Sequence, residues 1–228
     1  MKKLFTIILV TVFLVPAVAQ KISRITLTNS GNFERIEFDL GESVVLYFTK
    51  DGKIEKWGAN LFANRGDNYM DRLEEYSGKT GYFEATADSA YRGKIKFIGR
   101  TYFTYYSSYE NEFLQGKLKT IGNLFLDYYL AYENEAYRGN IKNLGPDSFT
   151  WYSAFENEGL RGKLRSFGST PFSYYSSFDD VAYRGRIKAI GNTAYTYYSS
   201  FDRAELRGSF KTGTQSTIVN GTRFFTRW

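Results

Sequence analysis

The chain has 228 residues, with 30 Lys and Arg against 24 Asp and Glu, and it contains neither cysteine nor histidine. These absences exclude Ser-His-Asp and Cys-His catalysis, zinc sites built on imidazole or thiolate, and disulfide bonds. The formal net charge of +6 comes from interspersed charges of both signs, so the composition does not indicate nucleic-acid binding.

Residues 1–19 are typical of a secretory signal peptide. Lys2 and Lys3 precede an apolar run from Leu4 to Val18, and the small residues Ala17 and Ala19 predict cleavage before residue 20. A membrane anchor is disfavoured because the run is short for a span. We therefore expect an exported protein of bacterial type, periplasmic or secreted, with the outer membrane as the alternative location.

Residues 20–58 predict an N-terminal β-meander. Apolar and polar residues alternate over 22–28 and 33–40, and the run 43–49 is rich in β-branched and aromatic residues. Asp51-Gly52 predicts a two-residue hairpin turn. The returning stretch, Gly52–Gly58, has the glycine spacing of Gly93–Gly99, so we interpret it as a diverged repeat unit. Residues 59–90 are irregular, and 78–90 resemble a shortened second half of a repeat, a degenerate hairpin preceded by a loop.

Residues 91–205 contain five tandem copies of a 23-residue unit, the first of which reads YRGKIKFIGRTYFTYYSSYENEF. Copies without insertions or deletions indicate units that pack on each other in a regular array. Each unit predicts two strands, Tyr91–Ile98 and Tyr102–Glu110 in the first copy, with one turn after Gly99 and another at Glu110-Asn111-Glu112. The first glycine of the unit then lies within a strand, where we expect it to permit close packing. It recurs as Gly93, Gly116, Gly139, Gly162, Gly185 and Gly208.

Alternation along these strands predicts one buried and one solvated face. Face one carries aliphatic and aromatic residues: Tyr91, Ile95, Phe103, Tyr105 and Tyr109, and in later units Leu118, Leu126, Trp151, Phe155, Leu164 and Phe178. Face two carries Arg92, Lys94, Lys96, Thr104, Tyr106, Ser108 and Glu110.

The basic residues of face two distinguish two architectures with this period. In a parallel solenoid, Lys94, Lys117 and Lys163 would belong to a ladder of like charges about 4.8 Å apart, which is destabilising. In a hairpin meander the same positions recur at about twice that spacing. We therefore predict an all-β fold, an antiparallel β-hairpin repeat meander forming an elongated, twisted sheet, with a closed β-barrel as the alternative.

The Tyr-x-Gly opening of the unit, Tyr91 to Gly93, and its length resemble MORN repeats, which are also hairpin units. The resemblance covers three positions per unit and implies the hairpin only. The tyrosine doublets are similar to the aromatic hairpins of choline- and glucan-binding repeats, without their Gly-Trp opening. After Gly208, the sequence around Asn220-Gly221 predicts a hairpin, so residues 206–228 are interpreted as a C-terminal cap.

The acidic corners of the repeats fit neither a calcium site nor a glycosidase pair. Glu110-Asn111-Glu112 and its equivalents offer fewer oxygen ligands than the six that calcium takes. Two carboxylates on one tight turn also do not span a sugar substrate. We expect no metal, no cofactor and no enzymatic activity.

One aromatic position of face two is kept as tyrosine in all five units: Tyr106, Tyr129, Tyr152, Tyr175 and Tyr198. Basic residues such as Lys96, Arg165 and Lys188 lie nearby in the pattern. The plain interpretation is cover for lysine stems and the sheet backbone. The functional hypothesis is a row that binds an extended, acidic polysaccharide or an envelope protein. The sequence thus predicts an exported binding or structural module, with a small outer-membrane β-barrel protein ending in Trp228 as the alternative.

Overall fold

The computed structural model describes residues 20–61 and 71–227, so the predicted signal peptide and Trp228 lie outside the described residues. Regular structure in this part of the chain is entirely β, in 19 strands. Within the same ranges there is no helix with the length and apolarity needed to cross a membrane.

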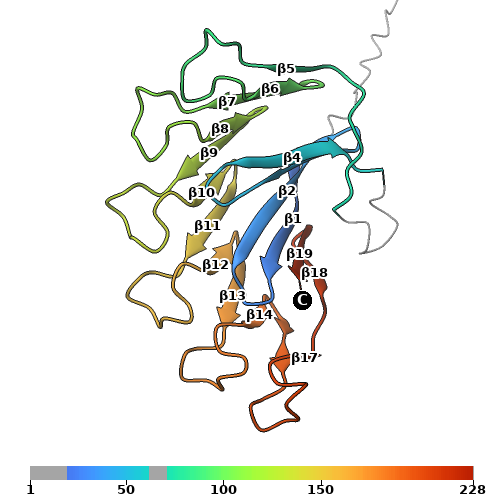
Figure 1. Cartoon of the computed structure of the whole chain (residues 1–228), viewed down its shortest axis with the longest axis vertical. Helices are drawn as coiled ribbons and strands as arrows, with labels where there is room; N and C mark the ends of the chain where they lie inside the picture. The colour runs from blue at the N-terminus through green and yellow to red at the C-terminus, as the bar shows by residue number, and fades with distance from the viewer. Residues whose placement is uncertain (1–19, 62–70, 228) are drawn as a thin grey trace, which may run out of the picture.

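The repeats form one open antiparallel sheet of eleven strands, which descends as a ladder through the molecule (Figure 1). Its order follows the sequence from β5 at one end to β15 at the other, with no pairing between these two end strands. The predicted all-β hairpin meander is therefore confirmed. The strands are β5 (Thr80–Tyr82), β6 (Ile95–Ile98), β7 (Thr101–Tyr105), β8 (Leu118–Ile121), β9 (Leu124–Tyr128), β10 (Ile141–Leu144), β11 (Asp147–Trp151), β12 (Leu164–Phe167), β13 (Thr170–Tyr174), β14 (Ile187–Ile190) and β15 (Thr193–Ala194).

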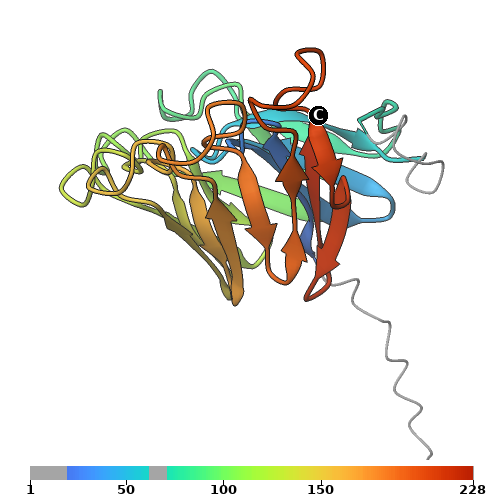
Figure 2. The same cartoon turned by 90° about the horizontal axis from the view of Figure 1, so that it is seen from below.

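A second sheet of six strands is built from the two ends of the described chain and covers one face of the repeat sheet (Figures 1 and 2). Its order is β18-β19-β1-β2-β3-β4, with β1 and β19 parallel and the other pairs antiparallel. The strands are β1 (Lys21–Thr28), β2 (Phe33–Gly41), β3 (Val44–Phe48), β4 (Ile54–Ala59), β18 (Ser216–Val219) and β19 (Thr222–Arg227). A separate pair, β16 (Thr196–Tyr197) and β17 (Phe210–Thr212), continues the last repeat.

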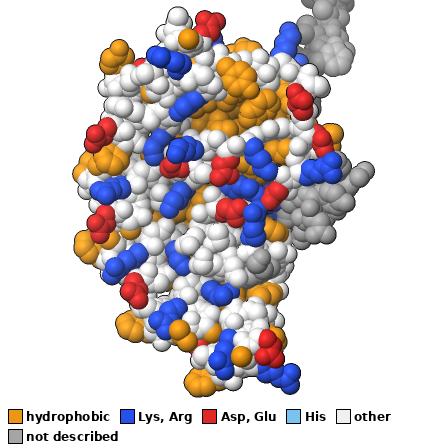
Figure 3. Space-filling view, viewed as in Figure 1, with side chains coloured by type: hydrophobic (Ala, Val, Ile, Leu, Met, Phe, Trp, Pro, Cys, Tyr) orange, Lys and Arg blue, Asp and Glu red, His pale blue; other side chains and the backbone are white. Residues whose placement is uncertain are grey.

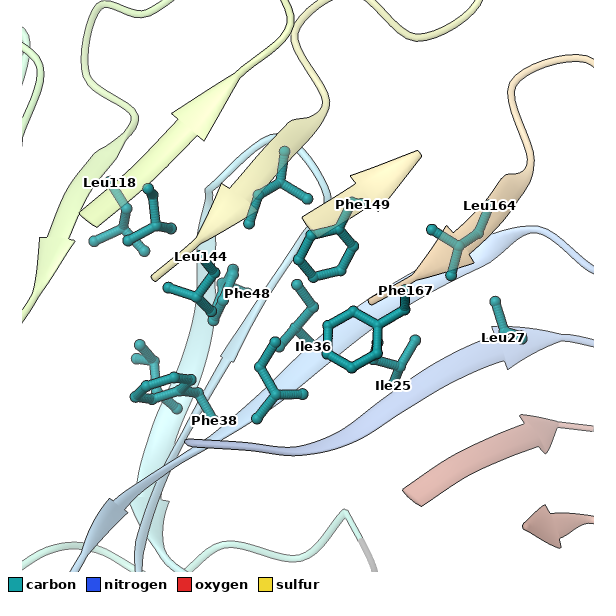
Figure 4. Packing of buried hydrophobic residues seen from close by; sticks show 14 of the residues in the cluster. Ile25, Leu27, Ile36, Phe38, Phe48, Leu118, Leu144, Phe149, Leu164 and Phe167 are labelled. Carbon is teal, nitrogen blue, oxygen red and sulfur yellow. The ribbon is translucent and has the colours of Figure 1, made fainter. Parts of the chain in front are cut away.

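The hydrophobic core lies between the two sheets. Phe149 and Phe167 of the repeat sheet, with ring centroids 4.9 Å apart, point toward Ile25 and Ile36 of the six-stranded sheet (Figure 4). At the C-terminal side, Phe224 of β19 packs its ring 5.3 Å from that of Phe172. Face one is therefore covered within the chain, a point that the repeat pattern left open.

Each repeat hairpin is shorter than predicted. The first one pairs Ile98 with Thr101 across a two-residue turn, Gly99-Arg100. Gly99 has φ +57° and Arg100 is not in the left-handed region, the pattern of a type II′ turn with glycine first. A β-bulge opposite Thr104 and Tyr105 interrupts the pairing with β8 before its last pair, Tyr105–Leu118.

The tight Glu-Asn-Glu turn is replaced by a long loop. The loop from Tyr106 to Lys117 is closed by two backbone bonds, in which Tyr106 N donates to Lys117 O and Gly116 N donates to Tyr106 O. Gly116 has φ +72°, and its equivalents have similar values. The prediction that these glycines lie within a strand is wrong: they turn the chain back into the sheet with left-handed geometry.

Two N-terminal predictions also need correction. The hairpin loop after β3 has three residues, since Thr49 N donates to Lys53 O, and only Gly52 has positive φ, +77°. The stretch Gly52–Gly58 is not a repeat unit, because β4 pairs with β3 in the six-stranded sheet. In contrast, β5 is the second strand of a repeat, 23 residues before Phe103–Tyr105, and the loop after it keeps its full length.

The C-terminal hairpin is present, with Asn220 at φ 51° and Gly221 at φ 80° in its turn. It does not pair with the last repeat strand. Instead β19 pairs with β1, so the hairpin extends the six-stranded sheet and contacts the repeat sheet through side chains, as in the Thr193–Thr217 hydroxyl bond of 3.0 Å.

The left-handed glycine predicts a graded effect of substitution at Gly139, which has φ +78°. Gly139→Val should lower the free energy of unfolding by about 1–3 kcal/mol, because a β-branched residue is strained there. Gly139→Asn should cost clearly less, since asparagine tolerates this conformation. Glu156→Ala, a surface control, should change it by less than about 0.5 kcal/mol. Urea unfolding of the three variants measures the order, and equal losses for Val and Asn would contradict the conformational explanation.

Candidate functional site: the tyrosine rows and the loop edge

The predicted tyrosine row ties each repeat to the next one. The first four hydroxyls of the row each donate to a backbone carbonyl twenty residues further along, in the next hairpin. The bonds are Tyr106–Leu126 at 2.8 Å, Tyr129–Phe149 at 3.0 Å, Tyr152–Phe172 at 2.9 Å and Tyr175–Tyr195 at 3.0 Å. Tyr106 is only 5% exposed, and burial raises its pKa to about 12. The other four rings are half-buried.

The aromatic residue just before this row bonds the partner strand of its own hairpin. Tyr105 and Tyr174 donate to the carbonyls of Ile95 and Leu164, at 3.0 and 2.9 Å. Where this row has Trp151, its indole Nε1 donates to Ile141 O at 2.9 Å. Tyrosine and tryptophan are interchangeable at this position because each brings a donor on a buried ring.

A cation lies over each ring of the predicted row, on the outer face of the repeat sheet. The distances from cation to ring centroid are 5.1 Å for Lys119–Tyr106 and Lys142–Tyr129, 5.6 Å for Arg165–Tyr152, 5.5 Å for Lys188–Tyr175 and 5.2 Å for Lys211–Tyr198. Lys96 makes the same contact with Phe83, at 5.8 Å. The structure thus brings all the predicted ligand-binding residues into one ladder, in which each ring carries a protein cation.

Carboxylates from the loops pair with three of these cations. Glu110 contacts Lys119 at 2.9 Å, Glu133 contacts Lys142 at 3.2 Å, and Glu156 contacts Arg165 at 3.7 Å. The hydrogen bond from Lys119 and that from Ser107 N hold the pKa of Glu110 below its usual value. Such exposed pairs contribute little to stability, but they fix where the loop leaves the sheet.

In each of two repeats, a lysine directly precedes the first strand of the hairpin and is not on the solvated face where it was predicted. Lys94 was assigned to the solvated face, yet its ammonium lies 5.2 Å from the ring of buried Tyr105 and donates to Gly116 O. Lys163 is 8% exposed and donates to Ser30 O at 2.6 Å and to Gly185 O. Burial lowers the pKa of Lys163 to about 8. The loop after the bulge breaks the alternation, so the period-2 pattern cannot be extended to these residues.

The acidic corners serve the loops themselves. Glu110 accepts a hydrogen bond from Ser107 N at 2.6 Å within its own loop. The asparagine or aspartate that follows accepts from a backbone N–H of the next loop: Asp88 from Ser108 at 3.1 Å, Asn134 from Ala154 at 3.0 Å, Asn157 from Ser177 at 2.7 Å and Asp180 from Ser200 at 3.0 Å. In residues 20–61 and 71–227, no cluster of three acidic side chains has a geometry suited to a metal ion.

Another concentration of charge lies on the far face of the six-stranded sheet. Buried Arg24 contacts Glu37 at 2.7 Å, while Arg35 and Arg227 each contact Asp71 at 2.5 Å. Although burial opposes it, the hydrogen bond and charge of Arg35 lower the pKa of Asp71. This network holds the chain at Asp71 against the sheet.

The alternation pattern of the sequence does not identify the most exposed aromatic residues as a set. Each loop of the five sequence repeats presents one ring at its tip, whereas the equivalent loop after β5 has Thr86 there. These rings have almost no cover: Tyr109 is 94% exposed, Tyr132 81%, Phe155 93%, Phe178 92% and Phe201 94%. Figure 3 shows hydrophobic side chains spaced along the edge of the molecule that the loops form, alternating with charged ones. We call this row the loop-edge aromatics. The prediction that Tyr109, Phe155 and Phe178 are buried is wrong, because the strand ends before them.

One signal in the sequence points to this row. The position is aromatic in all five units although it lies between small residues and an acidic turn, where a solvated loop needs no aromatic ring. Comparison with models of protein families, with curated proteins and with solved structures finds no match.

The hydroxyl bond between repeats predicts a measurable loss for Tyr129→Phe. The variant keeps the ring under Lys142 but leaves Phe149 O without its donor, which should cost about 1 kcal/mol of unfolding free energy. Tyr132→Phe, which removes an exposed hydroxyl, should cost less than about 0.3 kcal/mol. Chemical denaturation compares the two, and an equal effect would show that the bond does not stabilise the array.

Lys163 predicts that stability rises with pH between about 8 and 10. Its folded pKa of about 8 lies below the unfolded value of about 10.4, so the unfolded state binds more protons in this window. The slope of unfolding free energy against pH should stay below about 1.4 kcal/mol per pH unit, which is the value for a difference of one full proton. Lys163→Met should flatten it, as measured by urea unfolding at pH 7.5 to 9.5. Above pH 10 the raised pKa of tyrosines such as Tyr195, about 12, reverses the slope.

Proposed function

We propose that this protein is an exported, non-catalytic β-repeat module that binds an extended polysaccharide of the cell envelope or its surroundings. The observation that carries the proposal is the row of loop-edge aromatics, one nearly uncovered ring per repeat. Large exposed apolar side chains in a regular row mark an interaction surface, since isolated exposure would not recur at one position five times.

The spacing of the row supports a polymeric ligand. Successive rings belong to successive hairpins, so they recur about every 9–10 Å across the sheet. A polymer with a repeating face can contact several rings at once. Each contact alone is weak, and the affinity grows with the number of repeats engaged.

The rigidity of the loops supports binding without large ordering costs. The side chains of Asp88, Asn134, Asn157 and Asp180 each bond the next loop, so the tips are held in a fixed series. Phenylalanine and tyrosine add large contact area with few rotatable bonds. A preorganised row of this kind retains most of the interaction energy that a flexible loop would lose.

The polar neighbours favour a sugar over an anionic lipid surface. Asn111, Glu112, Glu135 and Glu158 follow the exposed rings, and acidic groups repel an anionic membrane. Amide and carboxylate oxygens accept hydrogen bonds from sugar hydroxyls, while the aromatic faces contact the apolar C–H faces of sugar rings.

The outer-face ladder remains the second candidate surface for the same ligand class. Its cations Lys142, Arg165 and Lys188 suit acidic substituents, but each already lies over a tyrosine ring. Polysaccharide contact there uses the cations, whereas contact at the loop edge uses the rings.

The two surfaces give different results in a sedimentation assay with insoluble peptidoglycan and with immobilised neutral and acidic polysaccharides. A loop variant replaces Tyr132, Phe155 and Phe178 by Ser, and a ladder variant replaces Lys142, Arg165 and Lys188 by Gln. We expect the loop variant to bind at least about tenfold more weakly, from roughly 1 kcal/mol per lost ring, and the ladder variant to retain binding at moderate salt. Unchanged binding by the loop variant, or no binding by the unmodified protein, overturns the proposal.

A further inference from the structure

A pocket of about 500 Å³ opens at the end of the sandwich where β4 faces β5 and β6. Its volume lies within the range of about 300–1,000 Å³ that is usual for small-molecule sites. Figure 3 shows hydrophobic side chains gathered in the hollow between these strands. The pocket is formed by both sheets and is separate from the loop edge.

The walls of the pocket are mainly apolar. Ile54 and Trp57 of β4 lie on one side, and Ile95 and Tyr105 of the first repeat lie on the other. Tyr82 at the rim is 54% exposed, while Ile95 and Tyr105 are buried. An aliphatic or aromatic body in this space would replace water beside five apolar surfaces.

The mouth of the pocket is positively charged. Lys53 and Lys94 line it, and neither ammonium has a carboxylate within ion-pair distance among residues 20–61 and 71–227. The pKa of Lys94 is lowered first by burial and then by the charge of Lys53, so the two cations act on each other.

The other charged groups of the lining do not cancel these two. The ammonium of Lys56 donates to Asp71 O at 2.7 Å and lies over the ring of Tyr47, away from the pocket. Glu55 is exposed and acts on the pKa of Lys56, but it does not contribute to that of Lys94. Outside the lining, burial lowers the pKa of Lys117, on which the charges of Asp51 and Lys53 act in opposite directions.

We propose that this pocket binds an amphipathic monoanion, a carboxylate carried on an aliphatic chain. The chain lies between Ile54, Trp57 and Ile95, and the carboxylate lies at the mouth between Lys53 and Lys94. Charge complementarity selects the anion, because two cations without a carboxylate partner beside an apolar cavity favour a negative head on an apolar body, even though Lys94 also donates to Gly116 O. This inference is independent of the polysaccharide proposal.

The first test is a chain-length series of hexanoate, octanoate and decanoate, below their micellar concentrations, followed by calorimetry. Each added methylene should raise the affinity, by up to about fourfold when fully buried. Decanol, which has the same chain without charge, should bind at least about tenfold more weakly than decanoate. Equal affinity for decanol and decanoate, or no dependence on chain length, overturns the proposal.

The second test locates the site. Lys53→Glu changes an exposed residue, so folding is retained, and it should weaken decanoate binding at least about tenfold. Lys211→Glu is the matched control, an exposed lysine on β17 in the last repeat, and should leave the affinity unchanged. Decanoate should also change the tryptophan fluorescence, and Trp57→Phe should remove that change while calorimetry still detects binding. Equal loss in both lysine variants shows a general charge effect and rejects this site.

Discussion

The array depends on the pairing of aromatic donors with strand carbonyls, from one row to the next hairpin and from the other row to the partner strand of the same hairpin. Hairpins of four or five residues per strand are too short to be stable alone, and the bulge after each one interrupts the ladder. Tyr129 and Tyr152 restore a bond at that point from the outside, while Tyr128 and Trp151 restore one from the core side. A buried carbonyl without such a donor would be costly, so these aromatics recur for structural reasons whatever surface the protein uses.

The same rows explain why the sequence predicted the architecture but did not reveal the loop-edge aromatics. Glycine and aromatic spacing specify a hairpin unit of fixed length, and like-charge spacing distinguishes a meander from a solenoid. Alternation, however, holds only while the chain stays extended. At Tyr106 the strand ends, and the loop that follows turns the ring of Tyr109 outward. The lysine directly after the last glycine of such a loop, Lys94 in the first repeat, lies against the buried ring of Tyr105. A period-2 pattern carries no information on where a loop of this length begins.

The six-stranded covering sheet is the other feature that the local sequence pattern could not predict. Residues 22–57 predicted their strands well, yet the pattern does not say that β4 leaves the repeats or that β19 pairs with β1. These long-range pairings follow from the burial of apolar surface. Face one must be covered by apolar side chains, and the strands at both ends of the chain provide them. The pocket at Ile54 and Ile95 lies where this cover ends, so it too is a product of tertiary packing.

The parallel pairing of β1 with β19 has a consequence for the order of folding. Arg24 and Arg223 are register partners, so β1, the first described strand, cannot complete its pairing before β19, the last one, is present. The contacts within each repeat are local, but the sheet that covers their apolar face is complete only when β19 has joined β1. Contacts of such sequence separation slow folding and keep an incomplete chain loosely structured. A chain that lacks β19 therefore leaves one edge of β1 unpaired and the ring of Phe172 without its contact to Phe224.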